Sequence, residues 1–359
     1  MNFERENIRR MAGYASGEQP DNELTIKLNT NENPYPPSPQ VSNVLSQIKP
    51  ESLRRYPPAT AQKFRQLAAE LHGLDLKNVI ATRGGDELLR LVITTFVDPG
   101  EKIGMTDPTY SLYSVLAQIQ DCPIVNAPLL ADWTLPEEFA QSMNDQKVKL
   151  TFLVNPHAPT GALMPIDQIS KLASKLNSIL LLDEAYIDFV DHHYQTAQLV
   201  KEHDNLIILR TLSKGYSLAG LRFGYGLADQ SLIAPMLHKT RDSYNLDFIS
   251  QRVAEAAIAD QDHVRANAKK VILERDRLRA ELQVLGIYCA DSQANFLLAT
   301  IPDTIKFSAA ELYQKLKDRH VLVRYFNAQR LDNKLRVSIG TGEENDQLLS
   351  TLVDILKQS

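Results

Sequence analysis

The sequence has few cysteines, no long apolar run and no excess of basic side chains. Its two cysteines, Cys122 and Cys289, form no Cys-X-X-Cys motif, so we expect buried thiols and neither a disulfide framework nor a metal site. Apolar runs such as residues 179–182 are far shorter than the roughly 20 residues that cross a bilayer. The N-terminal residues lack the apolar segment of a secretory signal, and we therefore expect a cytoplasmic protein that binds no membrane.

Net charge and composition narrow the class of protein further. With 39 Lys and Arg against 44 Asp and Glu, the formal net charge is −5, which gives no electrostatic reason to bind nucleic acid. Hydrophobic residues make up 43% and charged residues 23%, as in a folded globular protein. Since 359 residues exceed the roughly 250–300 at which a single hydrophobic core stops growing, we expect one large and one smaller domain.

The order of apolar runs and breakers predicts the architecture. Four prolines between residues 34 and 39 indicate an extended N-terminal arm over residues 1–40. In residues 41–270, apolar strands alternate with helical stretches, which predicts a large α/β domain whose mostly parallel sheet is covered on both faces. Residues 271–359 predict a second, smaller α/β domain. The strands expected in the large domain are residues 79–82, 149–154, 179–182 and 206–209.

Helices and the remaining strands follow from the same patterns. Apolar positions at helical spacing predict one helix that begins at Asp86 and another over residues 166–176. Residues 251–285 form a long helical stretch with a break near Asp260. The strands expected in the smaller domain are residues 294–299, 321–325 and 335–339.

Four features fall where the predicted strands end. They are Gly84-Gly85-Asp86, Asp183, Ser213-Lys214 and Arg222. Each alone has a plain structural explanation, which is a turn with a helix cap, a capping carboxylate, a solvated lysine or a structural ion pair. In open parallel sheets, however, ligands bind at the carboxyl ends of the strands, and amides at a helix start bind phosphate. Together, a phosphate cradle, a carboxylate and an amine match a phosphorylated cationic heterocycle with an aldehyde, such as pyridoxal phosphate.

Eight motifs occur in the order of a known protein family. They are Leu28-Asn-Thr-Asn-Glu-Asn-Pro34, Arg55-Tyr56-Pro57, Thr82-Arg-Gly-Gly-Asp-Glu87, Pro156-His-Ala-Pro-Thr-Gly161, Asp183-Glu-Ala-Tyr186, Thr211-Leu-Ser-Lys214, Ala219-Gly-Leu-Arg222 and Leu335-Arg-Val-Ser-Ile-Gly-Thr341. From about Tyr14 to the C-terminus, the chain resembles the fold-type-I pyridoxal-phosphate aminotransferases and, more closely, the histidinol-phosphate aminotransferase family. Related families share most of these motifs, so the resemblance defines the fold and the cofactor more narrowly than the substrate.

The resemblance implies a role for each residue around the cofactor ring. Lys214 would bind the cofactor covalently and, once displaced by substrate, would carry the proton from the substrate Cα to the cofactor C4′. Asp183 would pair with the ring nitrogen and keep it protonated, because a protonated ring withdraws electrons best. Tyr186 would donate a hydrogen bond to the phenolic oxygen, and Tyr110 would stack on the ring face.

The resemblance also implies how the phosphate group of the cofactor is bound. It would rest on the backbone amides of Gly85 and Asp86 at a helix start. Tyr56 would reach the same phosphate from a neighbouring subunit, which implies a homodimer with shared active sites. The other phosphate ligands would be Thr211, Ser213 and Arg222.

Substrate binding is implied for three further residues. Arg336 would bind the substrate α-carboxylate with both arms of its guanidinium. Arg324 and Tyr14 would bind a phosphate group at the distal end of the substrate. Without the resemblance, we would interpret Arg324 as a strand residue paired with a carboxylate. We would interpret Tyr14 as a packing residue.

One position departs from the family pattern. The family has an asparagine immediately before Pro-Thr-Gly, where it bonds the phenolic oxygen of the cofactor, and this chain has Ala158. Asn155, His157 or a water molecule are the alternatives for the missing donor, and the sequence does not choose among them. We expect His157 to be a loop residue and not a catalyst.

The chain is therefore expected to transfer an amino group from histidinol phosphate to 2-oxoglutarate in histidine biosynthesis, which yields imidazole acetol phosphate and glutamate. An aromatic amino acid aminotransferase and a phosphothreonine decarboxylase share the fold and remain alternatives. A cofactor-sensing transcription regulator would need a basic helix-turn-helix module, and we expect the aminotransferase fold to take up all 359 residues.

Overall fold

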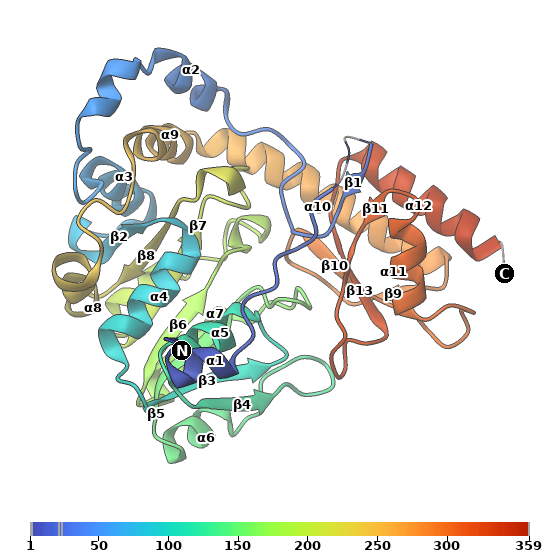
Figure 1. Ribbon diagram of the computed structural model, residues 1–359, viewed down its shortest axis with the longest axis horizontal. Helices are drawn as coiled ribbons and strands as arrows, with labels where there is room; N and C mark the ends of the chain where they lie inside the picture. The colour runs from blue at the N-terminus through green and yellow to red at the C-terminus, as the bar shows by residue number, and fades with distance from the viewer. Residues whose placement is uncertain (1–2, 21, 23, 358–359) are drawn as a thin grey trace.

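The computed structural model describes residues 3–20, 22 and 24–357. Residues 1, 2, 21 and 23 of the expected arm and residues 358 and 359 of the expected smaller domain lie outside this description. Figure 1 shows a large unit built on a twisted sheet and a smaller unit, in orange and red, with the long helix α10 (Gln261–Val284) running between them. Among the described residues, no helix combines the length and hydropathy of a bilayer-spanning segment.

Seven strands form the sheet of the large unit, in the order β2-β8-β7-β6-β5-β3-β4. Neighbouring strands from β7 to β4 are parallel, and β8 alone runs against its neighbours. The sheet confirms the predicted α/β class and the mostly parallel strand arrangement. The strands are β2 (Val79–Thr82), β3 (Lys102–Asp107), β4 (Ile124–Pro128), β5 (Val148–Val154), β6 (Ile179–Asp183), β7 (Leu206–Thr211) and β8 (Gly224–Ala228).

Each face of this sheet has its own hydrophobic core. Leu180 and Leu182 of β6 belong to one core, and Leu181 between them belongs to the other. Because helices cover both faces, the strands are apolar throughout and stand out as continuous apolar runs. The helices are α2 (Pro39–Gln47), α3 (Gln62–His72), α4 (Gly84–Phe96), α5 (Leu112–Ile119), α6 (Phe139–Asp145), α7 (Ile166–Lys175), α8 (Gln230–Pro235) and α9 (Phe248–Ala259), with short 3₁₀ or π segments at Pro50–Arg54, Leu76–Asn78, Ile187–Phe189, Ala197–Lys201, Ala219–Leu221 and Met236–Thr240.

The smaller unit has a third hydrophobic core around an antiparallel sheet. Its four strands follow the order β12-β13-β10-β9, and a separate pair joins β1 of the arm to β11 in parallel. Helices α10, α11 and α12 pack around these strands (Figure 1). The elements are β1 (Ile26–Lys27), β9 (Tyr288–Cys289), β10 (Phe296–Thr300), β11 (Val321–Leu322), β12 (Arg324–Tyr325), β13 (Lys334–Ser338), α11 (Ala309–Lys317) and α12 (Gly342–Lys357).

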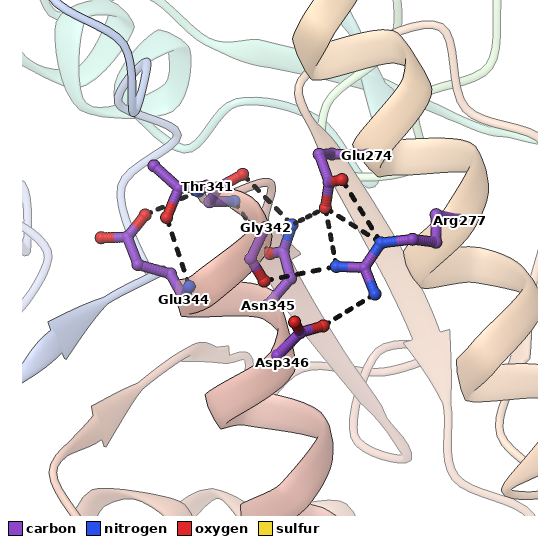
Figure 2. A network of polar contacts seen from close by, with 8 residues as sticks. Glu274, Arg277, Thr341, Gly342, Glu344, Asn345 and Asp346 are labelled. Atoms are coloured by element: carbon purple, nitrogen blue, oxygen red, sulfur yellow. Dashed lines mark hydrogen bonds and ion pairs between the residues drawn. The ribbon is translucent and has the colours of Figure 1, made fainter.

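A polar network fixes the start of α12 against α10 (Figure 2). Arg277 of α10 donates hydrogen bonds of 2.8 Å each to Glu274 and to Asp346 of α12. Asn345 donates to the same Glu274 carboxylate at 3.0 Å. Helix α12 follows β13, the strand that carries Arg336, after residues 339–341.

The structure corrects three expectations from the sequence and does not test a fourth, the domain boundary. The arm contains a short helix, α1 (Glu6–Arg10), which the sequence did not predict because none of its residues is buried. Helix α4 begins at Gly84, two residues before the expected start. The expected strand 321–325 is divided, since β11 pairs with the arm and β12 with β13. The expected domain boundary near residue 270 falls inside α10 and stays a prediction. The expected helix break near Asp260 is confirmed, because α9 ends and α10 begins there. The two cysteines are buried and free, as expected.

Candidate active site

A cavity of about 1090 Å³ opens at the carboxyl ends of the large sheet. The large unit, the smaller unit and the N-terminal arm all contribute to its walls. The structure thus brings together residues that are up to several hundred positions apart in the sequence. The predicted site residues that line it are Tyr14, Gly85, Asp86, Tyr110, Asp183, Tyr186, Thr211, Ser213, Lys214, Arg222, Arg324 and Arg336.

Lys214 lies just after the end of β7 and is partly buried in the cavity wall. Its Nζ donates a hydrogen bond of 2.9 Å to the carbonyl oxygen of Thr30 from the arm. Burial, and next the nearby Arg336 guanidinium, lower the pKa of Lys214 to about 8. A larger share of the amine is therefore neutral near physiological pH, which a nucleophile or a base requires.

Asp183 is the last residue of β6, and its carboxyl group is buried at the cavity. Tyr113 donates a hydrogen bond of 2.7 Å to its Oδ2, and the backbone N–H of Ala185 donates to its Oδ1 at 3.0 Å. Burial raises the pKa of Asp183 to about 6 in spite of these bonds. A cationic N–H group in the cavity would offset the cost of keeping this carboxylate charged.

Three tyrosines form a chain of ring contacts from the cavity to Asp183, with Tyr14 and Tyr110 in the cavity wall and Tyr113 buried behind them. The rings of Tyr14 and Tyr110 meet edge to face with centroids 6.0 Å apart, and those of Tyr110 and Tyr113 do so at 5.4 Å. On another wall, Asn31 Nδ2 donates to the Tyr186 hydroxyl oxygen at 3.0 Å. This bond leaves the Tyr186 O–H free to donate to a ligand.

The start of α4 and the turn before β8 form a cradle for an anion. Gly84 has φ +77°, and a Cβ at this position would lie 2.9 Å from a guanidinium nitrogen of Arg222. Arg222 donates to Asp86 Oδ2 at 3.2 Å and to Ser213 Oγ at 3.5 Å. Helix-start amides, hydroxyl groups and a guanidinium together are the donors that a phosphate group requires.

Two arginines face the cavity from adjacent strands of the smaller unit. Arg324 of β12 and Arg336 of β13 are direct partners in the antiparallel ladder. Both guanidinium groups lie near the ring of Phe326, at 5.6 and 5.5 Å from its centroid. The Arg336 Nε is buried without a hydrogen-bond partner, while another of its nitrogens donates to Asn29 at 3.0 Å. Two neighbouring cations with an unused buried donor fit a ligand with anionic groups.

Tyr56 is the one predicted site residue that does not line the cavity of this chain. Its side chain is 80% exposed and stacks on Tyr244 with ring centroids 4.4 Å apart.

Ala158, where the family has an asparagine, lies in the cavity wall. Asn155 bonds Tyr194 and Met164 at 2.7 Å each, and His157 bonds Thr160 and Pro108 at 2.8 and 3.0 Å. Since neither side chain lines the cavity, neither supplies the donor that Ala158 lacks.

Three contacts in the site involve residues that the sequence reasoning missed. Tyr113, which fixes Asp183, follows Tyr110 at helical spacing in the same segment, and that spacing was the available signal. Asn31 and Thr30 lie inside the motif Leu28-Asn-Thr-Asn-Glu-Asn-Pro34, but nothing local connects them to Tyr186 and Lys214. These contacts depend on the path of the arm over the large unit.

The residues around the cavity fit pyridoxal phosphate. A poised amine, a buried carboxylate, a stacking tyrosine and a phosphate cradle match its aldehyde, ring nitrogen, ring face and phosphate. The model of the family described as aminotransferase class I and II matches residues 24–352, and the chain belongs to this family. It is a pyridoxal-phosphate-dependent aminotransferase.

Curated relatives define the family more narrowly. The chain is 42% identical over 357 residues to histidinol-phosphate aminotransferase 1 of Nostoc sp., covering 99% of each chain. It is 40% identical over 352 residues to histidinol-phosphate aminotransferase of Microcystis aeruginosa, covering 98% of each. Within the class I and II aminotransferases, the chain is a member of the histidinol-phosphate aminotransferase family.

Solved structures share the fold. Histidinol-phosphate aminotransferase from Sinorhizobium meliloti, in complex with pyridoxal-5′-phosphate, superposes with a TM-score of 0.91 at 22% identity, covering 100% of this chain and 98% of that one. L-threonine-O-3-phosphate decarboxylase from Porphyromonas gingivalis superposes with a TM-score of 0.80 at 19% identity, covering 92% and 99%. At these identities the structures establish the fold and not the substrate.

Proposed function

We propose that this chain transfers the amino group of histidinol phosphate to 2-oxoglutarate and thereby produces imidazole acetol phosphate and glutamate in histidine biosynthesis. The observation that carries the proposal is the pair of arginines, Arg324 and Arg336, side by side on one cavity wall. An enzyme that accepts a phosphorylated amine in one half-reaction and a dicarboxylic amino acid in the other needs two anion sites. The names of the curated relatives support the same substrate.

The two arginines divide the anionic groups of the substrates. Arg336 binds the α-carboxylate of glutamate, for which its buried and unpartnered Nε offers a donor. Arg324 binds the phosphate of histidinol phosphate, and Tyr14 of the arm, whose ring meets that of Tyr110 edge to face, contacts the same phosphate. A planar guanidinium binds a carboxylate or a phosphate by two parallel hydrogen bonds, which lysine cannot do.

The residues of the large unit hold the cofactor and move the proton. When bound, pyridoxal phosphate withdraws electrons from the substrate Cα. Lys214 anchors the cofactor in the resting enzyme and then acts as the base that transfers a proton between the substrate Cα and the cofactor C4′. Asp183 keeps the ring nitrogen protonated, and Tyr186 donates a hydrogen bond to the phenolic oxygen. Tyr110 stacks on the ring face.

The cradle at the start of α4 would hold the phosphate of the cofactor. Its amides are those of Gly85 and Asp86, which the helix orients toward the anion. Arg222, which donates to Asp86 in this structure, would be shared between that carboxylate and the phosphate. The side-chain donors of the cradle are Thr211, Ser213 and Arg222.

We further propose a cytoplasmic homodimer in which Tyr56 completes the phosphate site of the other subunit. The exposure of Tyr56 outside its own cavity supports this assignment, since a tyrosine so exposed has no partner beyond Tyr244 among the described rings. The division into an arm (1–40), a large cofactor-binding domain (41–270) and a small domain (271–359) belongs to the same proposal. The separate hydrophobic core of the smaller unit supports it.

Half-reaction spectra test the substrate. Purified holoenzyme is mixed in turn with histidinol phosphate, phosphothreonine, phenylalanine and glutamate, and the cofactor spectrum is followed. Histidinol phosphate and glutamate are expected to convert the bound cofactor to its amine form. A fast reaction with phenylalanine alone favours the aromatic aminotransferase, and release of CO₂ from phosphothreonine favours the decarboxylase.

A further inference from the structure

Arg330 joins a loop of the smaller unit to the segment that follows β4 of the large unit. It lies in the loop after β12 of the smaller unit, and its two terminal nitrogens donate to the carbonyl oxygens of Leu129 and Leu130 at 2.6 and 2.7 Å. These two residues follow β4 of the large unit. The guanidinium carbon also lies 4.3 Å from the ring centroid of Trp133, so a cation–π contact accompanies the two hydrogen bonds.

The receiving segment, residues 129–134, is built to accept this guanidinium. Leu130 N bonds the Thr134 carbonyl at 2.9 Å, and Trp133 N bonds the Leu130 carbonyl at 3.0 Å, which closes a tight turn. At its start, Leu129 N donates to the Asp107 carbonyl at 3.0 Å. Asp107 precedes Pro108, Thr109 and Tyr110, so the turn is tied to the segment that carries the proposed stacking tyrosine.

The donating segment, residues 326–331, belongs to the smaller unit and forms part of the cavity wall. Phe326, Asn327, Ala328 and Leu331 line the cavity, and Phe326 contacts both substrate arginines. Arg330 itself has φ +67°, a left-handed conformation that is unfavourable for a residue other than glycine. The contacts to the turn therefore hold the loop in a shape that it would not prefer alone.

We propose that Arg330 is a positioning residue that holds the 326–331 loop against the large unit and thereby sets Arg324 and Arg336 at the distance their ligands require. The proposal rests on the substrate roles of these two arginines given above. Lysine could not replace Arg330 fully, because only a planar guanidinium reaches two adjacent carbonyl groups while it covers an aromatic ring. Arg330, Leu129, Leu130 and Trp133 are not among the residues that line the cavity, so we expect the contact to touch neither cofactor nor substrate.

Trp133 makes the contact observable, because it is the only tryptophan of the chain. Its fluorescence therefore reports on the ring that Arg330 covers, in the holoenzyme and without any substrate. The variants to compare are Arg330→Ala, Arg330→Lys, Trp133→Leu and the double variant Arg330→Ala/Trp133→Leu. Arg265→Ala is the matched control, since Arg265 forms an exposed ion pair with Asp262 on α10.

In Arg330→Ala, the Trp133 emission is expected to change in intensity and wavelength, and the KM for the amino donor is expected to rise by roughly tenfold, the scale of a lost charged hydrogen bond. The kcat is expected to change less than the KM, and Arg330→Lys to recover part of the loss. Trp133→Leu is expected to raise the KM in the same direction, and the double variant to add little to Arg330→Ala. The control should match the wild type.

Three outcomes would count against these proposals, and they distinguish a failure of the Arg330 proposal from a failure of the proposed function. Unchanged Trp133 emission in Arg330→Ala would show that the contact does not exist in solution and would overturn the proposal. Changed emission with a lower thermal midpoint and an unchanged KM would show a structural role only, which also overturns it. If the wild type rejects histidinol phosphate, the proposed function fails, and the KM is then compared for the amino donor that it accepts.

Discussion

The hydroxyl of Tyr113 lies 2.7 Å from Oδ2 of Asp183, and both side chains are buried. Tyr113 is itself fixed, because its ring stacks on Phe152 with centroids 4.6 Å apart. The tyrosine therefore holds the carboxylate in one orientation at the end of β6. The proposed pairing of Asp183 with the cofactor ring nitrogen would leave this contact intact.

The pKa of Asp183 predicts how cofactor binding depends on pH. Burial raises this pKa from 3.8 to about 6 in the free protein, so the carboxyl group takes up a proton as the pH falls through 6. A neutral carboxyl group no longer attracts the protonated ring nitrogen, and the affinity for the cofactor is expected to fall below about pH 6. The dissociation constant of pyridoxal phosphate, measured against pH, checks this.

Asp183→Asn is the control for that titration. It should bind the cofactor more weakly at pH 8 and lose the part of the pH dependence that Asp183 causes, and its kcat should fall roughly 100-fold or more. The raised pKa of Asp183 also makes the stability of the folded apoprotein depend on pH. A raised pKa favours the folded apoprotein below about pH 4, and this contribution is lost as the pH rises through 6. An identical pH profile in Asp183→Asn would contradict the assignment.

Lys214 is expected to be the residue that binds the cofactor covalently. Borohydride reduction of the holoenzyme, followed by peptide mass spectrometry, should find the cofactor on the peptide that contains Lys214. Lys214→Ala should abolish both the labelling and the transamination. Lys171→Ala, which removes an exposed lysine paired with Asp167, is the control and should retain both. Labelling of a different lysine would refute the role of Lys214.

Subunit mixing tests the proposed role of Tyr56. Tyr56→Ala and Lys214→Ala should each have low activity as homodimers. After subunit exchange, the mixed dimer has one intact site, and the activity should recover to about a quarter of the wild-type value, because half of the dimers are mixed and each has one working site of two. No recovery after demonstrated exchange would mean that Tyr56 does not act across an interface.

Ala158→Asn should be tolerated and should change the spectral titration of the bound cofactor. Ala158 lies in the cavity wall, and the side chains of Asn155 and His157 are bonded elsewhere. An added donor to the ionised phenolic oxygen favours the ionised form and should lower the pKa read from the absorption spectrum. Ala158→Val, which fills space without a donor, should leave that pKa unchanged. A titration of Ala158→Asn that matches the wild type would show that another group already fills the position.

The sequence predicted the parts of the site that sit at the ends of apolar runs. Asp183 was recognisable because the run Ile179–Leu182 stops at it, and Lys214 because it follows the next such run. The resemblance to a family then added Tyr186, Arg324 and Arg336. The contact between Lys214 and Thr30 joins residues 184 positions apart, and no local pattern encodes such a pairing. The antiparallel placement of β8 in the sheet escaped prediction for the same reason.

Helix α1 could not be predicted from the sequence for a different reason. It has Glu6 in its first turn and Arg9 and Arg10 in its last, which suits the helix dipole, but it buries no side chain. It is held by tertiary hydrogen bonds, from Arg5 to the Ile119 carbonyl at 2.7 Å and from Asn7 to the Gln118 carbonyl at 2.8 Å. A helix that is stabilised in this way leaves no hydrophobic periodicity in the sequence to detect.

The division of labour between Arg324 and Arg336 is the central claim, and single-turnover kinetics of Arg324→Ala test it most directly. The measured quantity is the ratio of the half-reaction rate constants with histidinol phosphate and with glutamate. Because only histidinol phosphate has a phosphate to lose, this ratio should fall roughly 10- to 100-fold in Arg324→Ala, the cost of a lost charged hydrogen bond. In Arg336→Ala the ratio should rise, since histidinol phosphate has no α-carboxylate. An equal loss with both substrates in both variants would contradict the account.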